Sequence, residues 1–146
     1  MYFSLQGNIG LGKAIEYFTS KSIPVSIPLN DTQKYDLVAD IDNKLCKISV
    51  KTSNCKTEYD SYTVNLRNCG GSSGKNKNRP FDKTSCDYIF VLTGNNRTYL
   101  IPSKVVDAVS SIAVGKKYAE YVVTSTSFSD FVNNTADELG ERSEPS

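Results

Sequence analysis

Three side chains that could bind a cation and stabilise negative charge fall within residues 34–52, which read KYDLVADIDNKLCKISVKT. Asp36 carries a carboxylate, Ser49 a hydroxyl and Lys51 an ammonium group. Carboxylate oxygens are hard ligands for divalent cations, and a placed ammonium group stabilises charge that develops during a reaction. The chain has no histidine, which removes the usual Ser-His and Cys-His nucleophilic sites and the usual zinc sites. Any metal chemistry therefore uses oxygen ligands and favours magnesium-like ions.

The same segment predicts two short strands folded into a hairpin. The turn signal is Asp-Asn-Lys at 42–44, because asparagine tolerates the left-handed backbone of tight hairpin turns. Side chains alternate between faces along a strand, and paired residues share a face. One face is apolar: Leu37, Ala39, Ile41, Cys46, Ile48 and Val50. The other carries Asp36, Val38, Asp40, Leu45, Lys47, Ser49 and Lys51, whether Asp36 pairs with Ser49 or with Lys51. This second face is the leading candidate site.

The remaining patterns predict an α/β fold with a small mixed sheet. Helical spacing of apolar residues predicts a helix over 7–21, and the proline-punctuated segment 22–29 predicts an edge strand. The nearly continuous apolar run 87–93 predicts a central strand, with 97–101 as its hairpin partner. The further expected elements are a strand within 58–66, a helix over 102–112 that begins at Pro102, a strand at 116–124 and a short helix at 128–133.

Composition fits a single ordinary globular domain. The chain has 146 residues, is 38% hydrophobic and 23% charged, and carries a net charge of +1. We expect one domain at 1–129 and, because the last seventeen residues hold five acids and one arginine, an acidic, partly disordered tail at 130–146. No segment matches a signal peptide or a membrane span, so we expect a cytoplasmic protein with no membrane partner. The four cysteines are expected to be reduced and mostly structural.

A basic segment interrupts the predicted strands. Residues 67–83 carry a net charge of +4 and are rich in glycine and asparagine. Long loops in compact domains are usually functional or disordered, so a disordered basic excursion is the alternative to a DNA-contacting arm. Arginine and lysine neutralise phosphates, and arginine also reads guanine edges. The candidate DNA-binding residues are Arg67, Lys75, Lys77, Arg79 and Lys83.

Several segments together resemble a known family in both order and spacing. They are GNIGLGKAIEYF at 7–18, IPVSIPL at 23–29, YDLV at 35–38, SVKT at 49–52, DYIFVL at 87–92 and TYLIP at 98–102. Over about residues 5–105 the chain resembles the group I intron-encoded homing endonucleases of the PD-(D/E)XK superfamily. The resemblance implies an α/β PD-(D/E)XK, restriction-endonuclease-like core with a small mixed β-sheet flanked by helices. It also implies site-specific, metal-dependent double-strand cleavage of DNA by phosphodiester hydrolysis.

The resemblance assigns roles to individual residues. Asp36, Ser49 and the backbone carbonyl of Val50 correspond to the ligands of one or two Mg²⁺ ions, and Lys51 to the catalytic lysine that orients water or stabilises charge. The catalytic set is therefore Asp36, Ser49 and Lys51. Two positions depart from the family pattern. Ser49 replaces an acidic or glutamine side chain, and Leu11 falls where the family has a helix-borne glutamate.

Partners and alternatives follow from the same resemblance. One site cuts one strand, so cleavage of double-stranded DNA implies a homo-oligomer, either a dimer or a tetramer. The apolar faces of 102–112 and 116–124 are the expected subunit contacts. Three functions stay open: an active homing endonuclease, a catalytically impaired DNA-binding relative, and a junction-selective nuclease of the same fold. The plainest alternative is that Asp36 and Lys51 form only a solvated cross-strand pair.

Overall fold

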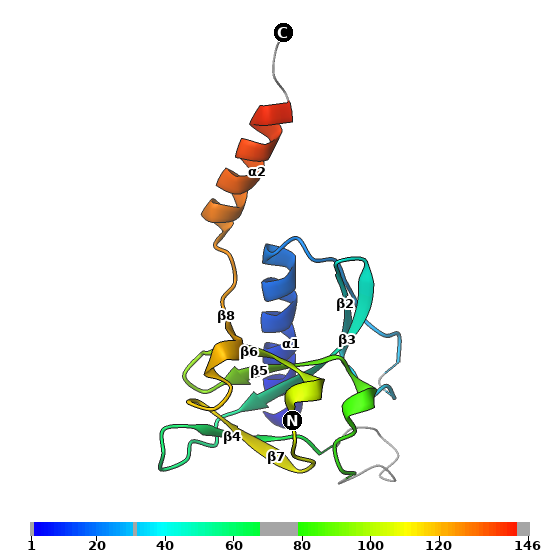
Figure 1. The fold of residues 1–146 in the computed structure, drawn as a ribbon, viewed down its shortest axis with the longest axis vertical. Coiled ribbons are helices and arrows are strands. Elements are labelled where there is room, and N and C mark those ends of the chain that lie inside the picture. Colours follow the sequence, from blue (N-terminus) through cyan, green and yellow to red (C-terminus); the bar gives the residue numbers. More distant parts are fainter. Residues whose placement is uncertain (1, 31, 68–78, 143–146) are drawn as a thin grey trace.

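The computed structural model describes residues 2–30, 32–67 and 79–142, and these form three layers (Figure 1). Helix α1 (Tyr2–Ser20) covers one face of the larger sheet, and a two-stranded sheet covers the other. Within the described residues the larger sheet has six strands in the order β1-β2-β3-β5-β6-β8. These are β1 (Val25–Ser26), β2 (Leu37–Ile41), β3 (Lys44–Ser53), β5 (Tyr88–Thr93), β6 (Thr98–Pro102) and β8 (Val122–Val123). The predicted mixed α/β architecture is confirmed.

The hairpin of β2 and β3 forms as its sequence predicts. Leu37 pairs with Ile48 and Ile41 with Lys44, so the turn consists of Asp42 and Asn43. Both turn residues have positive φ, 51° and 65°, as a tight hairpin turn requires. β3 then pairs in parallel with β5, while the other neighbouring strands of this sheet are antiparallel.

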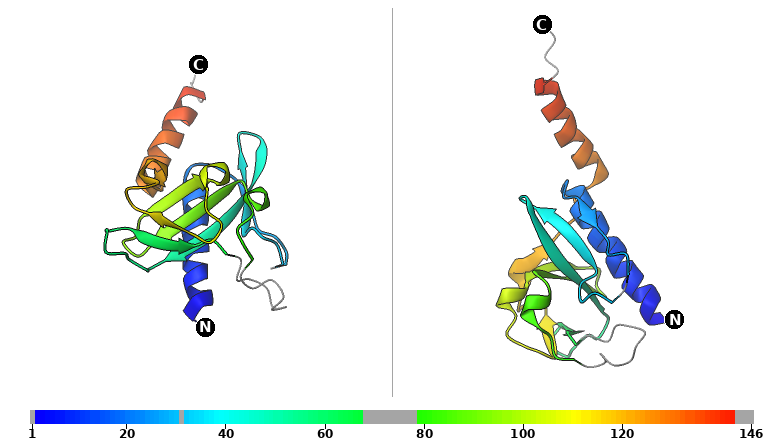
Figure 2. Two further views of the ribbon diagram at one scale, coloured as in Figure 1. Left: turned by 60° about the horizontal axis from the view of Figure 1, so that its bottom comes forward. Right: turned by 90° about the vertical axis from the view of Figure 1, so that its right-hand side faces the viewer.

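Helix α1 packs closely on the hairpin. Ala14 and Phe18 are fully buried in a cluster with the apolar face of the hairpin and with Phe90 of β5. At Gly10 the approach is tightest, because an added Cβ would lie 2.5 Å from Thr52 Cγ2. The helix begins at Tyr2, earlier than the predicted 7–21, and it runs past the sheet toward its N-terminal end (Figure 2).

The second layer is the antiparallel pair of β4 (Tyr62–Asn65) and β7 (Ser111–Val114). Its inner side chains Val64 and Val114 are fully buried and belong to the cluster that contains Ile89 and Val91 of β5. β5 is thus covered on both sides, which confirms its predicted central position. The predicted strand within 58–66 is confirmed as β4.

The predicted helix over 102–112 is wrong. A single 3-10 turn, Ser103–Val105, is followed by extended chain and then by β7. Helical propensity is low here because Val105, Val106 and Val109 are β-branched, and β4 supplies a partner for strand pairing. The expected subunit contact through the apolar face of a helix at 102–112 therefore cannot form as predicted. The strand expected at 116–124 is reduced to a 3-10 turn, Ala119–Tyr121, and the two residues of β8.

The C-terminal part is more helical than predicted. Helix α2 (Phe128–Arg142) replaces the short helix at 128–133 and most of the tail expected from 130 onward. It projects away from the three layers (Figure 1). The chain leading to it is fastened to α1, because the Thr126 N–H donates to Ser20 Oγ at 2.9 Å. Among the described helices, none combines the length and apolar character needed to cross a membrane.

Candidate active site

Asp36 lies where the pairing between β2 and β3 ends. Its N–H donates to the Ile48 carbonyl at 2.8 Å, and its Oδ2 accepts from the Val50 N–H at 2.7 Å. β2 starts at Leu37, so no strand residue stands opposite Val50, and the carboxylate takes the place of the missing backbone acceptor. One carboxylate oxygen is thereby fixed, while Oδ1 makes no hydrogen bond within the described residues.

The charge state of Asp36 is set by opposing influences. Burial in the surrounding protein raises the pKa of this carboxyl, and the Val50 hydrogen bond and the positive charge of Lys51 act in the opposite direction. Asp36 nevertheless keeps solvent access. Lys51 is half-buried and forms no ion pair with Asp36 in the part of the chain described. The positive charge of Lys51 therefore acts on Asp36 without a direct ion pair between the two side chains.

Ser49 occupies the same face as Lys51, one pleat earlier. It is 4% exposed, and within the described residues its hydroxyl makes no hydrogen bond. Among the described residues, the fully buried side-chain oxygen without a partner is the Tyr118 hydroxyl, so the Ser49 hydroxyl keeps some contact with solvent. The two neighbours across β5 are Ile89 and Val91, so apolar side chains border the site on that side.

Val50 completes the edge through its backbone. Its side chain packs against the α1-side cluster, which confirms the alternation predicted for the hairpin. The N–H and C=O of one strand residue point toward the same neighbouring strand, so the Val50 carbonyl faces the same open edge as Asp36. Asp36 Oδ1, the Val50 carbonyl and the Ser49 hydroxyl are oxygen donors that suit magnesium, which keeps several waters as ligands. The residues present fit a single divalent cation.

The protein supplies few carboxylates here. No cluster of three His, Cys, Asp or Glu side chains is present among the described residues. Leu11 is half-buried and packs against the α1-side cluster, so it offers apolar contact where the family pattern has an acid. Glu16 lies farther along α1 and is exposed; it lines a separate depression with Arg97 and Val123. Neither residue adds a ligand to Asp36.

The predicted DNA-binding residues are only partly placed. Lys75 and Lys77 lie outside the described residues. Arg67 is half-buried, and its guanidinium donates to Ser110 Oγ at 3.0 Å. Arg79 and Lys83 are exposed.

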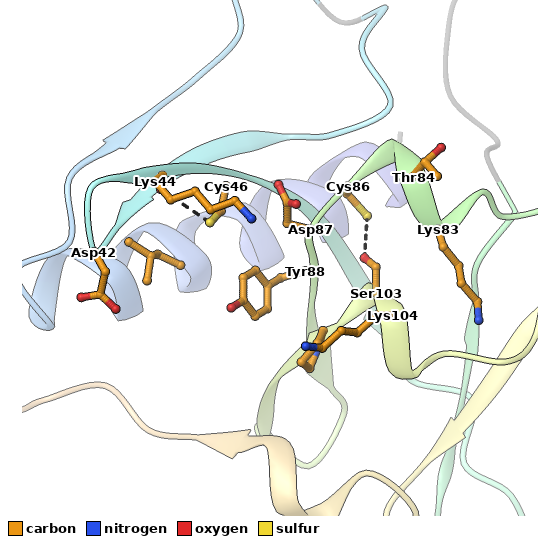
Figure 3. Close-up of a pocket in the computed structure, with 12 residues that line it drawn as sticks. Asp42, Lys44, Cys46, Lys83, Thr84, Cys86, Asp87, Tyr88, Ser103 and Lys104 are labelled. Carbon is orange, nitrogen blue, oxygen red and sulfur yellow. Dashed lines mark hydrogen bonds between the residues drawn. The ribbon is translucent and has the colours of Figure 1, made fainter.

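Lys83 borders an open groove of about 680 Å³ that sequence reasoning missed (Figure 3). Lys44 and Lys104 also line it, together with Asp87, whose Oδ2 accepts from the Lys47 N–H at 2.8 Å. These lysines come from three separate segments, so no local pattern predicts their meeting. The groove border therefore carries three lysines alongside Asp42 and Asp87, some distance along β3 from Ser49.

The cysteines take no part in the candidate site. Cys46, Cys55 and Cys86 are free, and Cys69 lies outside the described residues. Burial raises the pKa of the Cys86 thiol, which lies 3.3 Å from Ser103 Oγ. A buried thiol with a raised pKa is a structural rather than a nucleophilic group.

Comparison with known proteins places this geometry in a family. The fold matches the solved structure of a bacterial homing endonuclease, I-Ssp6803I, with a TM-score of 0.65 and 21% identity over 98% of each chain. At that identity the likeness is one of fold. A search of curated proteins gave no match. The family model for PD-(D/E)XK endonucleases matches residues 1–124, which is most of the chain, so this protein belongs to the PD-(D/E)XK endonuclease family.

Proposed function

We propose that this endonuclease makes site-specific, metal-dependent double-strand cuts in DNA, as a homing endonuclease does. Family membership supports DNA hydrolysis, and the likeness to I-Ssp6803I supports the homing role. The observation that carries the proposal is the fixed carboxylate of Asp36, held by the Val50 N–H at the edge that also presents Ser49 and Lys51. A solvated cross-strand pair would need no such backbone anchor.

The residues divide the chemistry among them. When bound, a divalent cation polarises the scissile phosphate and lowers the pKa of an attacking water. Asp36 Oδ1 and the Val50 carbonyl would hold that cation, with the Ser49 hydroxyl as a weak neutral ligand or a donor to a phosphate oxygen. Lys51 would donate to the phosphoryl oxygen as negative charge develops, and its half-buried position strengthens this interaction relative to bulk water.

Activity requires the ionised form of Asp36. Because the pKa of this carboxyl is raised, protonation begins at a higher pH than for an ordinary aspartate. The cleavage rate should therefore fall as the pH decreases through that raised pKa, because protonated Asp36 is a poor ligand for the cation. A bound cation would lower the pKa again, so excess magnesium should shift the acidic limb of the pH profile to lower pH.

The test is a cleavage assay with matched variants. Asp36→Asn and Lys51→Ala are compared with Asp40→Asn and Lys47→Ala, which change the same residue types on the same hairpin. Substrates are supercoiled plasmids that carry intron-free candidate targets, incubated with Mg²⁺ or with EDTA. The proposal predicts linear product with Mg²⁺ for wild type and both controls, and none for the two site variants. Equal cutting by all five proteins would overturn it.

A catalytically impaired DNA-binding relative is the second candidate. One observation favours it, namely that the described residues contain no group of three His, Cys, Asp or Glu side chains that could hold a metal ion. Duplex binding without cutting at any Mg²⁺ or Mn²⁺ concentration would identify that function. Preference for four-way junctions over the matching duplex would instead identify a junction nuclease.

The assembly is also part of the proposal. Each chain presents one candidate edge, so concerted cutting of both strands needs at least two copies, as a dimer or a tetramer. Sedimentation with and without target duplex measures the number of copies. A monomer that cuts both strands in one encounter would contradict this part.

A further inference from the structure

Helix α2 carries an apolar stripe that is open to solvent. Phe128 is 81% exposed and Val132 is 42% exposed, and one helical turn separates them. Phe131 and Ala136 fall on the same side of the helix by their spacing, and the sequence continues that spacing with Leu139. We call Phe128, Phe131, Val132 and Ala136 the α2 stripe. An apolar stripe of this kind normally faces a packed neighbour.

Hydrogen bonds hold the start of α2. Ser127 caps the helix, because its Oγ accepts from the Asp130 N–H at 3.2 Å and its carbonyl accepts from the Phe131 N–H at 2.9 Å. One residue earlier, the Thr126 N–H is bound to Ser20 Oγ at the end of α1. α2 therefore starts from a fixed point and extends beyond the end of α1, as the right view of Figure 2 shows.

The body of the protein gives α2 little packing. A hollow of about 270 Å³ lies between Lys21, just after α1, and Phe131 of α2. The helix has 15 residues, and an isolated helix of about this length is marginal in water even when its sequence is rich in alanine. Asn133, Asn134 and Gly140 lower the helix propensity further. Packing against another surface would supply the stabilisation that α2 needs.

The charge of α2 narrows the choice of that surface. The helix contains four acids and one arginine, a net charge of −3. Nucleic acids and anionic lipid surfaces repel such a helix. The four acids are Asp130, Asp137, Glu138 and Glu141, so three of them lie in the last two turns. A fitting partner therefore offers an apolar surface together with positive charge near the end of α2.

A second copy of this chain offers both features. Its own α2 supplies an equal stripe, and the start of that helix lies beside a cation. Lys21 is exposed, lines the hollow next to Phe131, and forms no ion pair within the described residues. In an antiparallel pair of helices, the last turns of one α2 lie beside the first turn of the other. The acidic end of each helix then lies near Lys21 of the partner subunit.

We propose that two copies of this chain associate through their α2 helices, which run antiparallel with the α2 stripes in contact. The choice of a second copy over a different protein rests on the proposed function, because cutting both strands needs two sites. The two helices overlap over about 22 Å, the length of 15 helical residues. Such a contact uses the same surface of both copies and closes at two, as a two-fold symmetric dimer does.

The first experiment measures association of the full chain without DNA. Phe128→Glu and Val132→Glu each place a charge in the α2 stripe, whereas Asn133→Glu places the same charge on an exposed position outside it. Sedimentation equilibrium should show a dimer for wild type and Asn133→Glu. The dissociation constant should rise at least about tenfold in the two stripe variants, because a charge would be buried. A wild type that stays monomeric at its highest soluble concentration, or unchanged association in both stripe variants, would overturn the inference.

The second experiment tests the antiparallel direction by disulfide crosslinking. Thr135→Cys lies at the middle of α2 and Phe128→Cys at its first residue, each in a chain that also carries Cys55→Ser and Cys69→Ser. Antiparallel pairing brings the middle residues together and keeps the first residues far apart. Mild oxidation should therefore link Thr135→Cys into dimers and leave Phe128→Cys unlinked. Crosslinks at both positions, or at neither, would overturn the inference.

The third experiment tests the charge contact. Lys21→Glu should raise the dissociation constant by about three- to tenfold at low salt and by less at high salt. Lys116→Glu, at an exposed lysine in the turn after β7, is the matched control and should leave association unchanged. Equal association of Lys21→Glu and wild type at low salt would overturn the antiparallel arrangement.

Cleavage separates a failure of this inference from a failure of the proposed function. Association and crosslinking are measured without DNA or metal. If wild type dimerises through α2 but never cuts DNA in Mg²⁺, only the proposed function fails. If wild type cuts both strands while the stripe variants sediment as wild type does, only this inference fails. When both hold, Phe128→Glu should release mainly nicked circles from a supercoiled target plasmid, where wild type releases linear product.

Discussion

The β2–β3 hairpin and the β4–β7 ribbon are both antiparallel pairs with one face in the core, yet they differ where pairing stops. In the hairpin, β2 begins at Leu37 opposite Ile48, two residues short of Val50, and the Asp36 carboxylate accepts the hydrogen bond of the Val50 N–H. In the ribbon, every residue of β4 has a partner in β7. An interrupted pair leaves backbone groups that can hold a reactive ligand, whereas a complete pair offers a regular surface. The hairpin edge is therefore where we propose that cutting occurs.

The largest effect that separates the two regions is expected from Lys51→Ala. Loss of the ammonium group should reduce cleavage by about a thousandfold or more, because it removes charge stabilisation in the transition state. Binding of uncut duplex should change by less than about threefold, since one phosphate contact among several is lost. Single-turnover cleavage and equilibrium binding measure the two effects. Lys47→Ala is the control, and an equal loss of binding and cleavage in Lys51→Ala would remove this residue from the chemistry.

Gly10→Ala should lower the free energy of unfolding by disturbing the packing of α1 on the hairpin, while the charged residues of the hairpin stay unchanged. The new methyl group would lie 2.5 Å from Thr52 Cγ2, a contact that forces helix and strand apart. Overpacking of this kind costs about 1–3 kcal/mol of unfolding free energy. Gly7→Ala and Gly12→Ala are the controls, because a Cβ at either meets no atom within 4 Å and alanine raises helix propensity by up to about 1 kcal/mol. Chemical denaturation gives the three values, and the same sign for all three would contradict the packing.

Much of the hairpin edge could be predicted from the sequence, because the residues that determine its turn and strand faces are neighbours in the chain. The turn, the alternation and the faces of Asp36, Ser49 and Lys51 all follow from a short contiguous stretch. The hydrogen bond from the Val50 N–H to Asp36 does not follow from this stretch, since it depends on β2 beginning only at Leu37.

The ribbon could not be predicted in the same way. β4 was expected as a strand, but its partner β7 lies in a segment where Pro102 and the residues after it favoured a helix. Tertiary pairing with β4 overrides that local preference. Lys83 was predicted to bind DNA, but its meeting with Lys44 and Lys104 at the groove was missed, because three distant segments bring these lysines together.

The pH dependence of stability tests the environment of Asp36 at the hairpin edge. A carboxyl whose folded pKa is raised binds more protons than in the unfolded chain, so its ionisation lowers stability as pH rises through the interval between the two values. Asp36→Asn removes that penalty and keeps an oxygen that can accept from the Val50 N–H. The variant should therefore be at least as stable as wild type at pH 7, and any gain should vanish at acidic pH. Thermal unfolding at both pH values measures this, and a variant less stable than wild type at pH 7 would contradict it.

Ser49→Gln is expected to have a smaller effect on cleavage. A glutamine carbonyl is a better cation ligand than a hydroxyl, so cleavage at limiting Mg²⁺ should rise by about three- to tenfold. The site is tight, since Ser49 is 4% exposed, and the longer side chain must reach outward past Ile89. Magnesium titrations of the cleavage rate test this. An unchanged half-saturation point with normal folding would exclude Ser49 as a ligand.

The central claim is that Asp36 holds a divalent cation at the edge left open by β2. The most direct measurement is binding of Mn²⁺, a spectroscopic stand-in for Mg²⁺, to wild type, Asp36→Asn and Asp40→Asn in the presence of uncut duplex. The account predicts that wild type and Asp40→Asn bind the ion with similar affinity and that Asp36→Asn binds it at least about tenfold more weakly, with cleavage lost in parallel. Equal Mn²⁺ affinity in Asp36→Asn and wild type would contradict the account.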